Sequence, residues 1–302
     1  MSTDRRDFLK LAGIGGAALV GLGLAAPKAV DAATSSAASV SGTKAMLYDS
    51  SKCVGCRACQ TACRTQNKLP PESDDFGLLY DNPLALSPGT LTLIKARETA
   101  IDGRTDLLLC KYQCMHCTDA GCVKTCPTGA LTHHELGFVL YDSEKCSGCG
   151  YCREACPFDV PRIGGNNVTG AQRMHKCTFC PERVTQGQPT ACAEACPAGA
   201  LVFGSRSDLV AQANQRLDVI KADCPNATFY GEDEVEGLHA MYILKEAPHV
   251  YVLPSVPKVS PSVELRQDLI KPFGYAVVGL AALGLGFNYL VARVRMKNEK
   301  ED

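Results

Sequence analysis

The fold is decided by the stretch Cys146-Ser147-Gly148-Cys149-Gly150-Tyr151-Cys152-Arg153-Glu154-Ala155-Cys156-Pro157. Its cysteines have the spacing C-x2-C-x2-C-x3-C, and a proline follows the last of them. Three thiolates two residues apart on a turning loop can reach three corners of one cubic cluster, whereas the fourth, on the helix that follows, points away toward a different one. The proline ends the run and redirects the chain. The stretch therefore predicts ligands of cubic iron–sulfur clusters.

Sixteen of the 18 cysteines fall into four groups of four. The first group repeats the spacing above, and the second widens the middle gap to four residues. The fourth has eleven residues between a C-x2-C pair and a C-x3-C pair. Because C-x2-C-x2-C-x3-C-P is the bacterial ferredoxin run for [4Fe–4S] ligation, four such groups predict four [4Fe–4S] clusters. The expected metal ligands are Cys53, Cys56, Cys59 and Cys63; Cys114, Cys117, Cys122 and Cys126; Cys146, Cys149, Cys152 and Cys156; and Cys177, Cys180, Cys192 and Cys196.

The chain repeats itself around these groups. Leu47-Tyr48-Asp49-Ser50 recurs as Leu140-Tyr141-Asp142-Ser143 after a shift of 93 residues, and the run CPTGAL at 126–131 is echoed by CPAGAL at 196–201. Groups two and three, joined by predicted strands at 128–131 and 137–141, form one contiguous two-cluster unit. Group four carries the end of a first half and group one the start of a second half, which predicts a second unit from segments far apart in the sequence.

The outward-pointing fourth cysteine gives a ligand scheme in which the two groups of a unit exchange one ligand. The expected sets are Cys114, Cys117, Cys122 with Cys156; Cys146, Cys149, Cys152 with Cys126; Cys53, Cys56, Cys59 with Cys196; and Cys177, Cys180, Cys192 with Cys63. The two units would line up four cubes as an electron-conducting wire. The predicted fold class is α+β, with two ferredoxin-like two-cluster units in one body at 46–205.

The N-terminus reads Thr3-Asp4-Arg5-Arg6-Asp7-Phe8-Leu9-Lys10, followed by a Gly/Ala-rich apolar stretch at 11–26. With the cleavage site Val30-Asp31-Ala32, residues 1–32 resemble a twin-arginine export signal. Asp4 is a departure, since such signals more often have Ser or Thr there. A Ser/Ala-rich linker at 33–45 follows.

Near the other end, residues 273–292 carry no charge. At about 1.5 Å per residue they cross a hydrocarbon core of about 30 Å, which predicts a transmembrane helix at 272–293 with Pro272 as its first residue. Arg293 and the basic residues that follow it predict that the tail at 294–302 lies in the cytoplasm. The chain is thus expected to cross the cell inner membrane once, with its bulk on the periplasmic side.

Several other classes of protein are disfavoured. A net charge of −1 without a long basic run argues against a nucleic-acid partner. A secreted disulfide-stabilised binding protein would rarely place cysteines three apart in repeated triplets, and zinc ribbons fit only the first pair of each group. The sequence has no phosphate-binding loop, zinc-protease helix or nucleophile elbow. No catalytic residue is assigned, and the chain is not expected to be an enzyme on its own.

Some residues near the groups are not expected to be ligands. Cys110 ends an apolar run at 107–109 and is predicted to be buried on a strand, whereas Cys224 has no assigned role. His116 and His175 lie in or beside the loops of the cysteine groups and are expected either to support the ligands from behind or to be structural. Lysines next to the cysteine groups are expected either to raise reduction potentials or to be simply solvated; they are Lys52, Lys124, Lys145 and Lys176.

With these motifs in view, the chain resembles the iron–sulfur subunits of membrane-bound molybdopterin oxidoreductases and hydrogenases. It is most similar to the β subunit of the formate dehydrogenase-N type. The stretches that carry this likeness are Tyr80-Asp81-Asn82-Pro83, Cys149-Gly150-Tyr151-Cys152, Cys156-Pro157-Phe158-Asp159-Val160-Pro161-Arg162 and His239-Ala240-Met241-Tyr242-Ile243-Leu244. The resemblance implies a catalytic molybdopterin subunit that oxidises formate outside the membrane, a membrane cytochrome b that passes the electrons to quinone, and a partner-binding extension at 206–271.

One departure keeps a second interpretation open. The formate dehydrogenase-N β subunit commonly lacks its own export signal, whereas the similar ferredoxin-like subunit of a periplasm-facing [NiFe] hydrogenase has one. Met46-Leu47-Tyr48-Asp49-Ser50 and Gln113-Cys114-Met115-His116-Cys117 resemble that hydrogenase subunit equally well. Formate dehydrogenase is the favoured interpretation and hydrogenase the alternative, and both imply electron transfer.

Overall fold

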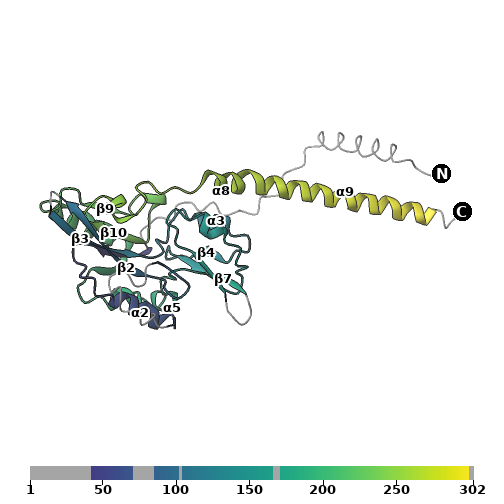
Figure 1. Ribbon diagram of the computed structural model, residues 1–302. Coiled ribbons are helices and arrows are strands. Elements are labelled where there is room, and N and C mark those ends of the chain that lie inside the picture. The colour runs from purple at the N-terminus through teal and green to yellow at the C-terminus, as the bar shows by residue number, and fades with distance from the viewer. Residues whose placement is uncertain (1–41, 71–84, 102–103, 166–170, 299–302) are drawn as a thin grey trace. The chain divides into compact units, whose positions relative to one another are not determined.

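The computed structural model describes residues 42–70, 85–101, 104–165 and 171–298 (Figure 1). The predicted export signal, most of the linker and the stretch Tyr80-Asp81-Asn82-Pro83 lie outside the described residues.

A four-stranded sheet with the order β8-β1-β10-β9 organises the core. Its strands are β1 (Lys44–Asp49), β8 (Leu201–Ser205), β9 (Thr228–Tyr230) and β10 (Ala240–Leu244). β1 runs antiparallel to β8 and parallel to β10, which is antiparallel to β9. All of β10 and all but the first residue of β1 are buried, because an unbroken apolar run suits a strand covered on both faces. The predicted extension at 206–271 therefore supplies two strands of the central sheet.

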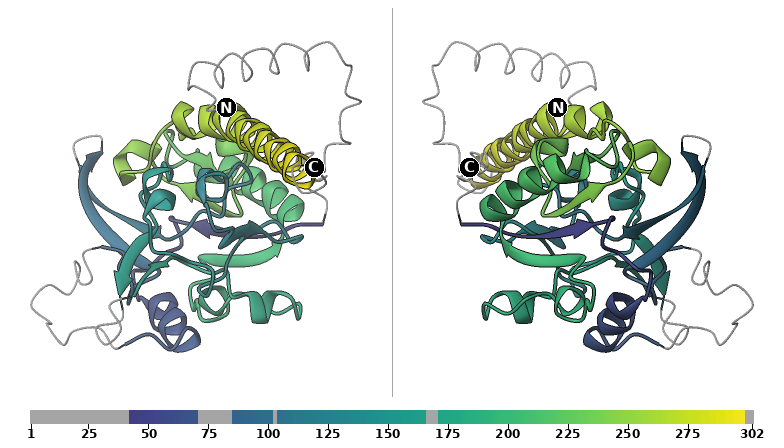
Figure 2. Two further views of the ribbon diagram at one scale, coloured as in Figure 1. Left: turned by 90° about the vertical axis from the view of Figure 1, so that its right-hand side faces the viewer. Right: turned by 90° about the vertical axis from the view of Figure 1, so that its left-hand side faces the viewer.

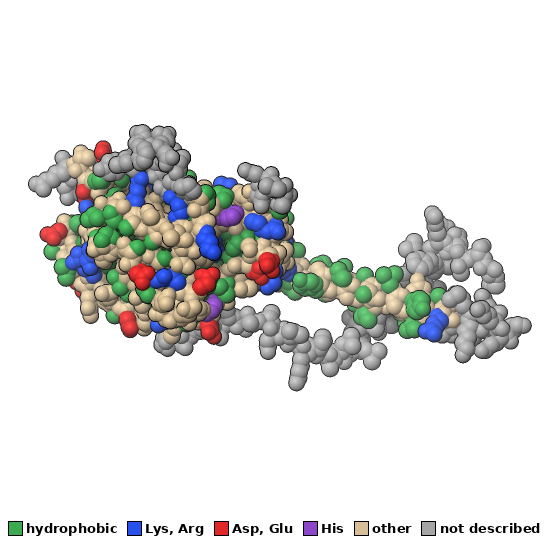
Figure 3. All heavy atoms as spheres, turned by 90° about the horizontal axis from the view of Figure 1, so that it is seen from below, with side chains coloured by type: hydrophobic (Ala, Val, Ile, Leu, Met, Phe, Trp, Pro, Cys, Tyr) green, Lys and Arg blue, Asp and Glu red, His purple; other side chains and the backbone are tan. Residues whose placement is uncertain are grey.

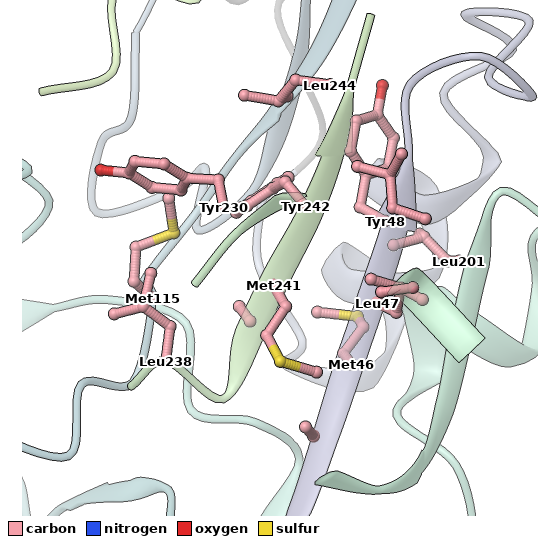
Figure 4. Packing of buried hydrophobic residues seen from close by; sticks show 14 of the residues in the cluster. Met46, Leu47, Tyr48, Met115, Leu201, Tyr230, Leu238, Met241, Tyr242 and Leu244 are labelled. Carbon is pink, nitrogen blue, oxygen red and sulfur yellow. The ribbon is translucent and has the colours of Figure 1, made fainter. Parts of the chain in front are cut away.

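The core is filled by tyrosine, methionine and aliphatic side chains, since the chain has no tryptophan. Tyr48 and Tyr242 meet edge to face on neighbouring strands, with ring centroids 5.5 Å apart (Figure 4). Helix α7 (Arg206–Ile220) packs on β1, β8 and β9 (Figure 2). Its buried residues include Leu209 and Ala213, which are four apart and so lie on one face.

In the described part of the chain, three two-stranded hairpins and five short helices accompany this sheet. The hairpins are β2 (Leu93–Ile101) with β3 (Arg104–Tyr112), β4 (Leu131–His133) with β5 (Val139–Tyr141), and β6 (Arg162–Gly165) with β7 (Gln172–His175). The helices are α2 (Ala58–Gln66), α3 (Gly121–Thr125), α4 (Tyr151–Glu154), α5 (Pro181–Val184) and α6 (Ala191–Glu194), and single 3-10 turns occur at Glu234–Glu236 and Pro248–Tyr251.

The strand predicted at 137–141 is observed as β5, but the strand predicted at 128–131 is wrong. The chain turns there, and β4 starts only at Leu131. Gly129 adopts the left-handed conformation with φ +64°, which is incompatible with an extended strand.

The repeats of the sequence recur in the pairing of the strands. In the β4–β5 hairpin, Leu131 pairs with Tyr141, and in the central sheet Leu201 of β8 pairs with Tyr48 of β1. In the sequence repeat, Leu201 is equivalent to Leu131, and Tyr48 is equivalent to Tyr141. The same antiparallel register is thus built once from neighbouring segments and once from opposite ends of the body.

The C-terminal segment is a continuous helical run through α8 (Pro261–Leu265), η4 (Arg266–Ile270) and α9 (Lys271–Asn298). The prediction that Pro272 begins this helix is wrong, because Pro261 takes that place. The helix widens to a π-helix at η4 immediately before α9, where Pro272 lacks an N–H to donate.

Within the described residues, this run is the one helix long and apolar enough to cross a membrane, and none of its most apolar stretch is buried. Apolar side chains point outward along α9, among them Phe273, Leu283 and Phe287, each more than two thirds exposed (Figure 3). An exposed apolar surface of this length fits a membrane anchor.

Replacing Gly137 by alanine is expected to destabilise the body. Gly137 has φ +96°, and an added Cβ would overlap the imidazole of His239, whose Nδ1 is held 2.7 Å from the carbonyl oxygen of Lys44. The left-handed backbone costs about 1 kcal/mol and overpacking about 1–3 kcal/mol. We therefore expect thermal unfolding, followed by circular dichroism in detergent, to begin at a clearly lower temperature.

Gly129→Ala is the matched control, since Gly129 also has a positive φ but nothing lies within 4 Å of an added Cβ. Its unfolding temperature should fall only by the amount that the left-handed backbone of an alanine costs. Equal shifts in the two variants would mean that His239 moves aside without cost.

Candidate iron–sulfur cluster sites

Three cavities in the described part of the chain are each lined by four cysteines. In every case three cysteines come from one sequence group and the fourth from another. The three sets are Cys53, Cys56, Cys59 and Cys196; Cys126, Cys146, Cys149 and Cys152; and Cys63, Cys177, Cys180 and Cys192.

The remaining four predicted ligands also lie together. Burial raises the pKa of the Cys117 thiol well above its ordinary value, and the nearby sulfurs of Cys114, Cys122 and Cys156 raise it further. This electrostatic coupling requires the four side chains to be close in space. The fold thus gathers twelve of the predicted ligands into three cavities, each lined by two sequence groups, and the remaining four lie near one another.

The arrangement of the thiols suits a cube better than a single ion or a disulfide. All 18 cysteines are free thiols. Among the described residues, no three Cys, His, Asp or Glu side chains converge closely enough to hold one metal ion. Four thiols spread around a cavity instead match a cluster that takes one thiolate at each of four corners.

Two of the ligand loops follow the same backbone path. Gly55 and Gly148, which are equivalent in the repeat, both have φ +70°. Two residues later, Arg57 and Gly150 are also left-handed and cap α2 and α4. At Gly148 a Cβ would lie 2.6 Å from the backbone oxygen of Gln172, so the turn that aims these thiols inward requires glycine.

The other two loops pack against each other through equivalent residues. His116 and Phe179 each stand third in a C-x2-C pair, both have positive φ, and their rings lie 4.8 Å apart. His116 is fully buried, and its Nδ1 accepts a hydrogen bond from the Val139 amide. Burial lowers the pKa of His116 well below its usual range, and the ammonium of Lys176 adds to this. A neutral, packed imidazole agrees with the predicted structural role.

Burial also determines the charge of the thiols before metal binds. It raises the pKa of Cys59 to about 11, of Cys63 to about 12 and of Cys156 to about 11. At neutral pH these groups are therefore protonated in the protein without clusters. Because clusters bind thiolates, their assembly must release protons.

Of the four lysines singled out in the sequence, one is buried beside a ligand. The Nζ of Lys176 donates to the carbonyl oxygens of Val139 and Cys177, at 2.8 Å and 3.1 Å. Lys124 and Lys145 instead form ion pairs with Asp119 and Asp142, and Lys52 is exposed.

Sequence reasoning missed one buried lysine, Lys111 on β3, which is 0% exposed. It is not next to a cysteine group in the sequence. The available signal was a charged residue that directly follows the apolar run 107–110. Cys110 is buried on the same strand, as predicted. Cys224 is half-buried after α7 and belongs to none of the four sets.

Comparison with known proteins agrees with these sites. Residues 105–206 match the family described as 4Fe-4S dicluster domain. The iron–sulfur subunit of the nitrate-inducible formate dehydrogenase of Escherichia coli K12 is 40% identical over 251 residues, covering 82% of this chain and 84% of that protein. The formate dehydrogenase-O iron–sulfur subunit of the same organism is 37% identical over 265 residues, covering 85% and 86%.

A further relative is the hydrogenase-2 operon protein HybA of Escherichia coli O157:H7. It is 40% identical over 224 residues, covering 71% of this chain and 66% of that protein. With two formate dehydrogenase relatives aligned over more than four fifths of its length, and a dicluster domain at its centre, the chain belongs to the family of formate dehydrogenase iron–sulfur subunits.

Proposed function

We propose that this chain relays electrons through four [4Fe–4S] clusters, from an exported molybdopterin subunit that oxidises formate to a membrane cytochrome b and then to quinone. The observation that carries the proposal is the grouping of the predicted ligands into sets that mix two sequence groups, three of which each line a cavity. When bound, each cluster supplies one-electron chemistry. The chain itself has no catalytic residue in this proposal.

The ligand sets follow the crossed scheme. Cys126 completes the set of Cys146, Cys149 and Cys152, and Cys156 completes the set of Cys114, Cys117 and Cys122. In the second unit Cys196 completes the set of Cys53, Cys56 and Cys59, and Cys63 completes the set of Cys177, Cys180 and Cys192. The matching registers of β4–β5 and β8–β1 support two equivalent units.

Short helices hold the two clusters of a unit near each other. Helix α2 carries both Cys59 and Cys63, which belong to different sets. Four residues along a helix rise about 6 Å, so the two sites lie close enough for electrons to pass. Helix α3 does the same in the other unit, with Cys122 inside it and Cys126 as its C-cap.

The two units meet through one ligand of each. Cys114 and Cys177 are buried together with Val160 in a small apolar cluster. This contact joins the set that contains Cys114 to the set that contains Cys177. It supports a linear order in which the sites completed by Cys126 and by Cys196 form the two ends of the wire.

The membrane placement follows from the exposed apolar helix. In the proposal α9 crosses the inner membrane, the export signal at 1–32 and the basic tail assign the body to the periplasmic side, and residues 206–271 contribute surface to the partner interface. The HybA relative favours one alternative, a hydrogenase complex with a different catalytic subunit and the same electron-transfer role.

The metal content of the protein and the subunits that purify with it test this proposal. Detergent-extracted protein, purified anaerobically through a C-terminal tag, should contain about sixteen irons per chain. A pterin-bearing large subunit and formate-dependent quinone reduction should accompany it. A nickel-containing partner with hydrogen uptake would move the chain to the hydrogenase alternative, and iron-free protein would overturn the proposal.

The crossed ligand scheme can be tested at Cys126. Because serine is a poorer ligand than cysteine, Cys126→Ser should abolish or alter the same low-temperature paramagnetic signal as Cys146→Ser, and leave the signal that Cys114→Ser removes. Each variant should lose up to about four irons. Cys224→Ser is the control and should keep all signals. A Cys126→Ser spectrum matching that of Cys114→Ser would show uncrossed ligands.

The anchor can be tested by ending the chain at Lys271, which removes the apolar part of α9. The full chain should stay in the membrane fraction after an alkaline carbonate wash, because it buries apolar surface in lipid. The shortened chain should be released by the wash with its iron content unchanged. Retention of the shortened chain would show that another segment holds it in the membrane.

A further inference from the structure

A lysine is buried in the body without reaching water. Lys111 lies on β3 and is 0% exposed, and its Nζ donates hydrogen bonds to Thr92 Oγ1 and Gln113 Oε1. Both acceptors are neutral, so the bonds solvate the ammonium without cancelling its charge. Burying a charge in this way is costly unless something nearby compensates for it.

The position of Lys111 relates it to two cluster cavities at once. Its partner across the β2–β3 hairpin, Ile94, lines the cavity of Cys53, Cys56, Cys59 and Cys196. Its two hydrogen-bond acceptors line the cavity of Cys63, Cys177, Cys180 and Cys192. The ammonium is therefore held between the two sites of one proposed unit.

The electrostatics agree with this position. Burial by itself lowers the pKa of Lys111, but the sulfurs around it outweigh burial and raise the pKa above its ordinary value. The sulfurs that raise this pKa belong to both sets. Cys59 belongs to one set, and Cys63, Cys177 and Cys192 belong to the other. Once clusters are bound, the thiolates of both sets would supply the negative charge that compensates the ammonium.

Gln113 has a second polar group available. Its Oε1 accepts from Lys111, whereas its buried Nε2 finds no hydrogen-bond acceptor among the described residues. Since Gln113 lines the cavity, this N–H can donate to sulfur once a cluster is bound. Hydrogen bonds to cluster sulfurs are among the factors that determine reduction potential.

We propose that Lys111, held in place by Thr92 and Gln113, supplies a fixed positive charge that raises the reduction potentials of two clusters. These are the two clusters of the unit formed by sequence groups one and four. Reduction adds one negative charge to a cluster, and a fixed positive charge in a region of low dielectric favours the reduced form. Because one ammonium serves both sites, the two potentials rise together. The inference rests on the proposed four-cluster function.

Lys111→Met, which keeps the length of the side chain and removes its charge, tests this in the complete detergent-extracted complex. In a redox titration followed by electron paramagnetic resonance, two of the four clusters should become harder to reduce. At a fixed potential we expect their reduced-to-oxidised ratio to fall at least about tenfold, which corresponds to about 59 mV for a one-electron couple. The other two clusters should titrate as before.

Lys95→Met is the matched control, since Lys95 lies on the facing strand but is exposed. It should leave all four potentials unchanged. Fully loaded Lys111→Met protein with unchanged potentials, or with all four shifted equally, would overturn the inference. The iron content and the number of paramagnetic signals of the wild-type protein test the proposed four-cluster function separately. A failure of that function can therefore be told apart from a failure of the inference about Lys111.

If Lys111→Met assembles with too little iron, Gln113→Glu replaces it as the decisive variant. It nearly preserves the side-chain shape and places a carboxylate beside the ammonium, which neutralises the charge without emptying the site. The same two clusters should then become harder to reduce. Unchanged potentials in loaded Gln113→Glu protein would equally overturn the inference.

Discussion

The structure depends on one constraint, which is that four short cysteine side chains must surround each of several small cavities. A cysteine sulfur lies only one carbon beyond the backbone, so the backbone itself has to curve around the site. Left-handed residues such as Gly55 and Gly148 make these curves, and helices such as α2 supply a further thiol from the next turn. The loops are consequently fixed more by the sites than by a conventional apolar core.

The crossed sets also determine how distant segments meet. A set that takes Cys196 together with Cys53 requires the two ends of the body to lie side by side. The antiparallel pairing of β1 with β8 achieves this, and β10 then covers the other edge of β1. In the proposed arrangement of two units, the central sheet closes the second unit, whereas the first needs only the short β4–β5 hairpin.

Charge compensation links the sites to the surrounding protein. Burial keeps thiols such as that of Cys63 protonated without metal, and thiolates bound to clusters bring negative charge into a region of low dielectric. Two buried lysines can compensate this negative charge: Lys176 lies beside Cys177, and Lys111 lies between two cavities. The same arrangement explains how a charged lysine is tolerated in the interior, since thiolates bound to clusters nearby compensate its charge.

The sequence by itself determined the four cysteine groups, the internal repeat and the apolar C-terminal segment, because each depends on spacing within a few residues or on an unbroken run. Local reasoning failed at Pro272 and at 128–131, where a π-helix and a left-handed glycine changed the backbone. Only the tertiary structure decided that residues after 206 complete the central sheet and that Lys111 lies between two sites. These features depend on contacts between segments far apart in the chain, and such contacts leave no periodic trace in the sequence.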